Sequence, residues 1–158
     1  MMEYCVDDNG VLYDFKDDEV HTEITIPHGV RVIGKAVFAD NEFLYHVVLP
    51  DTVERIEREA FANCCSLSRV LIPDGVTYIG PYAFADCRSL RSITLPESVA
   101  EIDPFAFWIR QEWDEYLTGG PYCIYGKRGS EAERFAHRSP FLFKEITADE
   151  RHGYHKDL

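Results

Sequence analysis

Apolar residues return along this chain at a fixed interval of 23 residues. The clearest marker is a proline that directly follows an apolar residue, at Pro27, Pro50, Pro73 and Pro96. Six apolar columns keep the same register: Ile24, Val47, Val70 and Ile93; Ile26, Leu49, Ile72 and Leu95; Val30, Val53, Val76 and Val99; Ile33, Ile56, Ile79 and Ile102; Phe38, Phe61, Phe84 and Phe107; and Leu44, Leu67 and Leu90. A unit of this length cannot bury its apolar side alone, so the pattern predicts a solenoid of stacked units.

The third unit illustrates the local structure that the spacing predicts. Val70 and Ile72 alternate with Arg69 and Leu71, which is the period-two pattern of a strand, and β-branched residues favour that state. Proline cannot donate a hydrogen bond to a ladder, so Pro73 fits the first position after the strand. Stacked strands lie about 4.7–4.9 Å apart, so each apolar column should form a ladder of similar side chains.

The remainder of each unit should return the chain to the next strand. Val76 and Ile79 lie three positions apart and are expected on the opposite wall of the coil. They are followed by Ala83-Phe84-Ala85-Asp86, in which small residues flank a phenyl ring that must point inward. We expect a short helical or 3₁₀ segment here, with the aspartate bonding nearby backbone amides in an Asx turn.

The repeating unit carries a family resemblance. Its pattern, Leu-x-x-Val-x-Ile-Pro-x-Gly-Val-x-x-Ile-Gly-x-x-Ala-Phe-x-x-Cys, is nearly complete in residues 67–87 and resembles the BspA-like leucine-rich repeat over roughly residues 22–108. The resemblance implies a right-handed leucine-rich-repeat solenoid with stacked parallel strands. Proteins of this family are often secreted or displayed on bacterial surfaces, where they are thought to bind host proteins or other macromolecules, and the family supplies no catalytic motif.

Both ends are expected to cap the solenoid, because terminal coils otherwise expose their apolar ladders. At the N-terminus, residues 4–13 indicate a hairpin with a type I′ turn at Asn9-Gly10. At the C-terminus, Ser130 and Glu133 form a capping-box pattern that predicts a helix over residues 131–137, followed by a strand over residues 141–146. We therefore predict a single domain with an N-terminal cap (1–21), four 23-residue repeats (22–108), an atypical last coil with the C-terminal cap (109–147) and a polar tail (148–158).

The segment 108–117 departs from the repeat, with Arg110 and Trp113 where a cysteine and a leucine are expected. One interpretation is an imperfect last coil in which Trp108 and Trp113 pack as cap residues, as is usual for terminal repeats. The other is an acidic, aromatic loop in which Trp113 and Tyr116 contact a partner or a second copy of the chain, because Trp and Tyr are enriched at interfaces.

The strand positions that point away from the core should form one broad surface, because their side chains do not pack in the core. Tyr45, His46, Arg69, Leu71 and Arg91 occupy such positions and combine aromatic, basic and apolar groups. This mixture is favoured at interface hot spots. An ordinary sheet surface, with residues chosen for strand propensity, explains the same residues equally well.

Charge and composition narrow the choice of partner. Sixteen Lys and Arg against twenty-eight Asp and Glu give a net charge of −12, which repels nucleic acid and anionic membrane surfaces. The chain contains no apolar run long enough to cross a membrane, and its first residues do not form a signal peptide, so a cytoplasmic location is the default expectation despite the family's usual place. The five cysteines are an odd number and are sparse, which does not indicate a disulfide framework. Free thiols are therefore expected.

No pattern points to catalysis. Only His152 and His155 lie close together among the histidines, and neither a third metal ligand nor a nucleophile-base pair accompanies them, so we expect no metal, no cofactor and no enzyme. The sequence instead favours a protein-binding, adhesin-like module, with a protein or glycan partner. The alternative is a structural or self-assembly unit that associates through a solenoid end or through residues 108–117.

Overall fold

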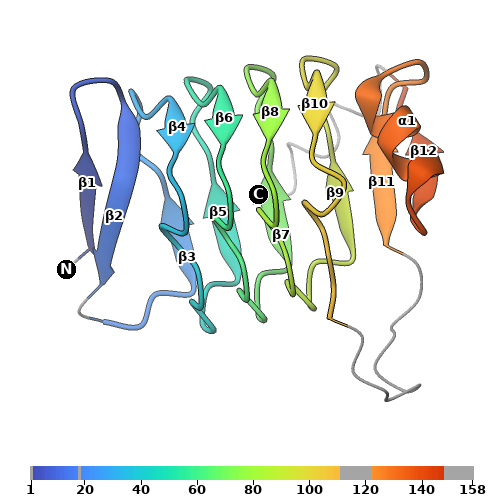
Figure 1. The fold of residues 1–158 in the computed structure, drawn as a ribbon. Coiled ribbons are helices and arrows are strands. Elements are labelled where there is room, and N and C mark those ends of the chain that lie inside the picture. Colours follow the sequence, from blue (N-terminus) through green and yellow to red (C-terminus); the bar gives the residue numbers. More distant parts are fainter. Residues whose placement is uncertain (1, 18, 111–121, 148–158) are drawn as a thin grey trace.

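The computed structural model describes residues 2–17, 19–110 and 122–147. Its chain winds into a solenoid of parallel strands that form two walls (Figure 1). The first wall contains β3 (Glu23–Thr25), β5 (His46–Val48), β7 (Arg69–Leu71), β9 (Ser92–Thr94), β11 (Cys123–Gly126) and β12 (Leu142–Glu145). The second wall contains β1 (Met2–Val6), β2 (Val11–Asp17), β4 (Val32–Ile33), β6 (Arg55–Ile56), β8 (Tyr78–Ile79) and β10 (Glu101–Ile102).

The register of the ladders confirms the repeat. Ile33 is paired with Ile56, and Ile56 with Ile79, so each residue lies beside its equivalent one unit further along the chain. Every residue of the six apolar columns is buried. The phenyl rings of the Phe column stack nearly parallel, with centroids 5.1 Å, 5.3 Å and 5.2 Å apart from Phe38 to Phe107.

The third side of each coil differs from the expected helical or 3₁₀ segment, because residues 35–40 and their equivalents form consecutive turns. The amides of Ala36, Phe38 and Asp40 donate to carbonyls of the next coil at 2.8–3.0 Å, which leaves them unable to make the local bonds of a helix. The expected Asx turn at these aspartates is also absent at Asp40, whose carboxylate accepts a hydrogen bond from the Asn63 side chain at 2.7 Å. Bonds between coils therefore alternate with local turn bonds, such as that from the Ala39 amide to the Ala36 carbonyl at 3.1 Å, and a continuous helical ladder does not form.

The N-terminal hairpin is present, but its turn is not type I′. Gly10 has a φ of 78° and its amide donates to the Asp7 carbonyl at 3.0 Å, whereas Asn9 does not adopt a left-handed conformation. The Asp7 carboxylate accepts hydrogen bonds from the amides of Asn9 and Val11, both at 2.9 Å, and so stabilises a type I turn with a left-handed glycine at its end. Strand β2 then pairs in parallel with β4 and covers the first coil.

The C-terminal cap consists of α1 (Glu131–Arg138) and β12, as predicted. Helix α1 contacts β10, β11 and β12 and buries Phe135 against the last coil. The predicted capping box does not form, since the Ser130 hydroxyl donates to the Lys127 carbonyl at 2.6 Å and Glu133 accepts from the Gly129 amide at 2.8 Å. Because the Ser130 hydroxyl bonds within the tight turn before the helix, it does not cap the helix.

Candidate functional site

The outward side of the first wall is the surface that the core leaves free. In β3, β5 and β7 the central residue is buried while its two neighbours face outward. The ladder aligns Glu23, His46 and Arg69 in one row, and Thr25, Val48 and Leu71 in a second row. Strand β9 continues the surface with Ser92 and Thr94. We call the outward residues of β3, β5, β7 and β9, together with Tyr45 and Arg91, the strand face.

The five partner-binding residues predicted in this region lie on neighbouring coils. His46 and Arg69 are paired across β5 and β7, and Leu71 follows Arg69 on the same side of β7. Tyr45 and Arg91 are exposed and directly precede β5 and β9, so they lie at the end of the strands where Arg69 is found. The other two predicted residues, Trp113 and Tyr116, lie outside the described residues.

His46 differs from the free surface residue that the sequence suggested. Its ring is half-buried, and its Nε2 atom is buried without a hydrogen-bond partner among the described residues. Burial lowers the pKa of His46 below its ordinary value, and the neighbouring Arg69 adds to this effect, while Glu23 opposes it. His46 therefore remains neutral at neutral pH and contributes ring surface rather than positive charge.

The arginines of the strand face differ from most others in the molecule. Arg31, Arg55 and Arg58 lie 2.9 Å, 2.8 Å and 3.1 Å from carboxylate oxygens. Arg69 and Arg91 are exposed, and neither has a carboxylate within ion-pair distance in the part of the chain that the structure describes. On a chain with a net charge of −12, these two side chains form a local site of uncompensated positive charge.

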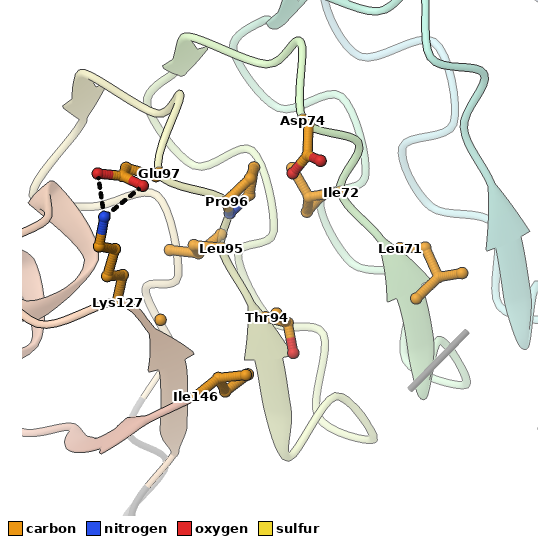
Figure 2. A pocket seen from close by; sticks show the side chains of 10 residues that line it. Leu71, Ile72, Asp74, Thr94, Leu95, Pro96, Glu97, Lys127 and Ile146 are labelled. Carbon is orange, nitrogen blue, oxygen red and sulfur yellow. Dashed lines mark hydrogen bonds and ion pairs between the residues drawn. The ribbon is translucent and has the colours of Figure 1, made fainter. Parts of the chain in front are cut away.

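The first wall is interrupted beside these arginines. Strands β7 and β9 lie side by side, yet they belong to separate three-stranded sheets, β3-β5-β7 and β9-β11-β12. A small pocket of about 50 Å³ opens near this interruption, across the C-terminal ends of β7, β9 and β11 (Figure 2). It is lined by Leu71, Ile72, Asp74, Thr94, Leu95, Pro96, Glu97, Gly126, Lys127 and Ile146. The strand face therefore leads into an apolar pocket with a charged rim.

The sequence did not reveal this pocket, because its walls come from four segments that are distant along the chain. Leu71 and Thr94 belong to neighbouring strands, whereas Lys127 and Ile146 belong to the C-terminal cap. At the rim, Lys127 Nζ lies 2.8 Å and 2.9 Å from the two carboxylate oxygens of Glu97. Only the docking of the cap beside the fourth coil brings these residues together.

Two cysteines at equivalent coil turns, Cys64 and Cys87, are buried and have unreactive thiols. Burial raises the pKa of the Cys64 thiol to about 12 and that of Cys87 well above its ordinary value. Both thiols donate to backbone carbonyls of the preceding coil, Cys64 to Phe38 and Cys87 to Phe61, at 3.1 Å. They serve as buried structural groups, because the nucleophilic form of cysteine is the thiolate. Among the described residues, no cluster of three or more His, Cys, Asp or Glu side chains could hold a metal ion.

Trp108 is less enclosed than a packed cap residue would be. Its indole is 41 % exposed and meets the Tyr82 ring edge-on with centroids 6.2 Å apart. Phe105, 51 % exposed, stacks on the Tyr82 ring with a centroid distance of 5.7 Å. These rings form a second exposed aromatic group, on the turn side of the solenoid.

A comparison with known sequence families identifies the repeat. The BspA-type leucine-rich repeat region matches residues 12–111 in six copies, which is more than half of the chain. The chain belongs to the BspA-type leucine-rich-repeat family. The family match begins at residue 12, whereas the resemblance in the sequence was placed from about residue 22. Residue 12 lies in β2, and the first two residues of β2 pair in parallel with β4, as the strands of successive repeats do.

Solved structures of bacterial leucine-rich-repeat proteins share this fold. A cell surface protein from Faecalibacterium prausnitzii A2-165 superposes with a TM-score of 0.70 at 23% identity over 96% of this BspA-type chain and 40% of its own length. A leucine-rich-repeat protein from Bacteroides capillosus gives a TM-score of 0.64 at 28% identity, covering 80% and 94% of the two chains. The pneumococcal vaccine antigen PcpA gives a TM-score of 0.51 at 14% identity, over 92% of this chain and 46% of its own length.

The BspA-type chain thus spans less than half the length of the Faecalibacterium protein. No functionally curated protein matches its sequence. In the described part of the chain, no helix is long and apolar enough to cross a membrane. The family and its structural relatives are repeat proteins, consistent with a role in protein interaction.

Proposed function

We propose that this chain is a non-enzymatic, adhesin-like module that binds a protein through the strand face. The observation that supports the proposal most directly is the pair of exposed arginines, Arg69 and Arg91, which lack carboxylate partners among the described residues of a strongly acidic molecule. Arg69 lies two residues before the half-buried Leu71 on β7, and the exposed Tyr45 directly precedes His46, which is paired with Arg69. Arginine, tyrosine and a desolvated apolar centre are the combination from which interface hot spots are built.

A binding role also accounts for the regularity of the repeat. Catalysis requires titratable groups that converge in a pocket and interrupt the pattern around them. The four coils between Glu23 and Ile102 keep every apolar column, and their buried thiols are held in the protonated form. A partner that lies across several coils can instead use side chains that vary without disturbing the core.

A pull-down with the immobilised domain tests the proposal. We expect the wild-type domain to retain a protein from host extracellular material, and the double substitution Tyr45→Ala with Arg69→Glu to abolish retention. The control replaces an exposed tyrosine and an unpaired exposed cation elsewhere, Tyr13→Ala with Lys35→Glu, and should retain the partner. Retention of a glycan instead of a protein, or equal loss in both variants, would refute a protein site on the strand face.

Self-assembly is the second candidate, and the exposed rings of Phe105 and Trp108 favour it. Large apolar side chains that remain exposed together often mark contacts between proteins. Light scattering at high concentration distinguishes the two functions, because a monomer excludes assembly through this region. If a partner's affinity withstands Arg69→Glu with Arg91→Glu but is lost on Trp113→Ala with Tyr116→Ala, the contact lies in residues 108–117 and not on the strand face.

A further inference from the structure

The pocket across the ends of β7, β9 and β11 is a continuation of the strand face. Leu71 and Thr94 occupy equivalent outward positions on the two strands, and both line the pocket (Figure 2). Its walls are otherwise mainly aliphatic, with Ile72, Leu95 and Ile146 buried behind them. A volume of about 50 Å³ is several times the roughly 10–15 Å³ that a water molecule requires. The pocket therefore has room for the end of an aliphatic side chain.

Charge is distributed unevenly around this pocket. Arg69 and Arg91 lie at the ends of β7 and β9 where the strands begin, and neither is paired with a carboxylate within the described ranges. At the ends where the strands finish, Asp74 and Glu97 line the pocket rim. The Glu97 carboxylate is already engaged by Lys127. An anionic group on a ligand is consequently attracted toward the arginines and repelled from the opposite rim.

From these two features we infer the chemistry of the partner. The strand face binds an extended polypeptide segment in which an acidic residue and an aliphatic residue lie two positions apart. The carboxylate meets Arg69, and the aliphatic side chain enters the pocket beside Leu71 and Thr94. The inference rests on the proposed function, and it adds the sequence pattern that the partner must present.

The spacing follows from strand geometry. Arg69 and Leu71 are two residues apart on the same side of β7, so their side chains are separated by about 6.6–6.8 Å along the strand. Two side chains on one side of an extended ligand have the same separation. Guanidinium and carboxylate groups form paired hydrogen bonds, and an apolar anchor in a pocket excludes water from its surroundings. The two contacts can therefore form together without distortion of either chain.

A peptide array tests the pattern directly with the full chain as the probe. Each immobilised peptide carries one Glu and one Leu in a Gly-Ser-Thr background, with every separation and order of the two residues represented. We expect strongest binding where Glu and Leu are two positions apart, and weaker binding at every other separation. Thr94→Leu, which fills the pocket, and Arg69→Glu should each weaken binding to that peptide at least tenfold in fluorescence polarisation.

Matched controls separate these effects from general disturbance. Thr77→Leu makes the same substitution at an exposed position just before β8 on the second wall, and Lys35→Glu makes the same charge change at another exposed site outside the strand face. Both should bind like the wild type, and all four variants should keep its circular dichroism spectrum. Arg69→Glu should in addition prefer a peptide in which Lys replaces Glu, which loss of folding cannot produce.

Three results would overturn the inference: binding that is independent of the Glu-to-Leu spacing, no binding to any peptide in the array, or full binding by Thr94→Leu. None of them alone refutes the proposed function. If the pull-down retains a protein in a manner dependent on Tyr45 and Arg69 while the array shows no spacing preference, the strand face binds its partner through another pattern. If the pull-down shows no dependence on these residues, the proposed function itself is wrong.

Discussion

At the scale of single residues, the coil imposes a backbone conformation that its amino acids do not favour. Ala36, Glu59 and Tyr82 occupy the same position in successive units and have φ values of 54°, 59° and 58°. A left-handed conformation costs residues of this kind about 1–2 kcal/mol each. The Ala36 amide donates a hydrogen bond to the Arg58 carbonyl of the next coil at 3.0 Å. This bond between coils stabilises the strained backbone in the first of these turns.

Ala36→Gly should consequently stabilise the protein. Relief of the left-handed strain contributes about 1–2 kcal/mol, and the greater freedom of glycine in the unfolded chain offsets roughly 0.4–1 kcal/mol of it. We expect a net gain of about 0.5–1 kcal/mol in the free energy of unfolding, measured from the urea midpoint. Ala100→Gly, at an exposed position without a positive φ, should lower the midpoint. A lower midpoint for Ala36→Gly than for the wild type would contradict this explanation.

Glu131 is the buried carboxylate at the start of α1. Burial by itself would raise the pKa of Glu131, but hydrogen bonds from Arg134 and Arg138 outweigh it and lower the pKa below its usual value. A carboxyl group with a lowered pKa in the folded state stabilises the fold at pH above its unfolded pKa. That contribution is lost as the pH falls through the folded value.

Glu131→Gln should therefore destabilise the protein at pH 7 and make little difference at pH 2–3. The measurement is the urea midpoint of both proteins across this pH range. The exposed Glu101→Gln serves as the control and should follow the wild type throughout. A deficit for Glu131→Gln that persists unchanged at pH 2–3 would show that the ion pairs with the two arginines are not its cause.

At the scale of the elements, the N-terminal hairpin is joined to the solenoid by an unusually close approach. The Gly34 amide donates to the Leu12 carbonyl of β2 at 2.9 Å, and a Cβ at Gly34 would lie only 2.3 Å from that oxygen. The family repeat also favours glycine here, as at Gly80, so the sequence marks the position although it does not state the reason. In the structure, the reason is the contact between β2 and the first coil.

Gly34→Ala should loosen the hairpin cap. The added methyl group forces the β2 backbone away, and overpacking of this kind costs about 1–3 kcal/mol. We expect faster hydrogen exchange in β1 and β2 than in β7, measured by mass spectrometry. Gly75→Ala, where the nearest oxygen would be 3.0 Å away, provides a milder comparison in the middle of the solenoid. Equal loss of protection in both variants and in all strands would argue against a separate role for this contact.

The elements also show where prediction from the sequence ended. The hairpin and the terminal helix were predictable from Asn9-Gly10 and from the Ser130 to Glu133 pattern, but the bonds inside both turns were not. In each case a side chain close in sequence, Asp7 or Glu133, accepted the amide hydrogen bonds that decide the geometry. Local propensity locates a turn, whereas competition among several nearby acceptors determines its type.

At the scale of the whole molecule, aromatic rings form one ladder from cap to cap. Phe15 extends the Phe column toward Tyr4, with centroids 5.0 Å from Phe38 and 5.1 Å from Tyr4. At the other end, Tyr122 lies 5.5 Å from Phe107 and 5.3 Å from Phe141. Phe15 lies one 23-residue period before Phe38, so the sequence already contained the signal that the hairpin shares this core. Each coil is stabilised by its neighbours through the ladder.

Phe61→Ala should therefore disrupt the solenoid at its centre. Its ring is fully buried between Phe38 and Phe84, and removal of a buried phenyl group costs about 3–5 kcal/mol. We expect a thermal midpoint lower by roughly 6–20 °C, on the basis of about 2–4 °C per kcal/mol for a domain of this size. Phe43→Ala, which removes a ring that is 58 % exposed, should leave the midpoint nearly unchanged. A similar loss in both variants would contradict the ladder.

The sequence alone determined the repeat length, the apolar columns, the parallel register and the position of both caps. The first three follow from residues that recur at one period, because each side chain then meets its own equivalent in the next coil, and the caps follow from local turn and helix signals at either end. The tertiary structure decided the turns on the third side, the burial of His46, the interruption between β7 and β9 and the pocket beside it. They depend on bonds between backbone groups 22 or 24 residues apart, such as Phe38 with Ala60, and on the docking of residues 126–146 against the fourth coil. Such contacts follow from how the chain stacks in space, and no local pattern of amino acids encodes them.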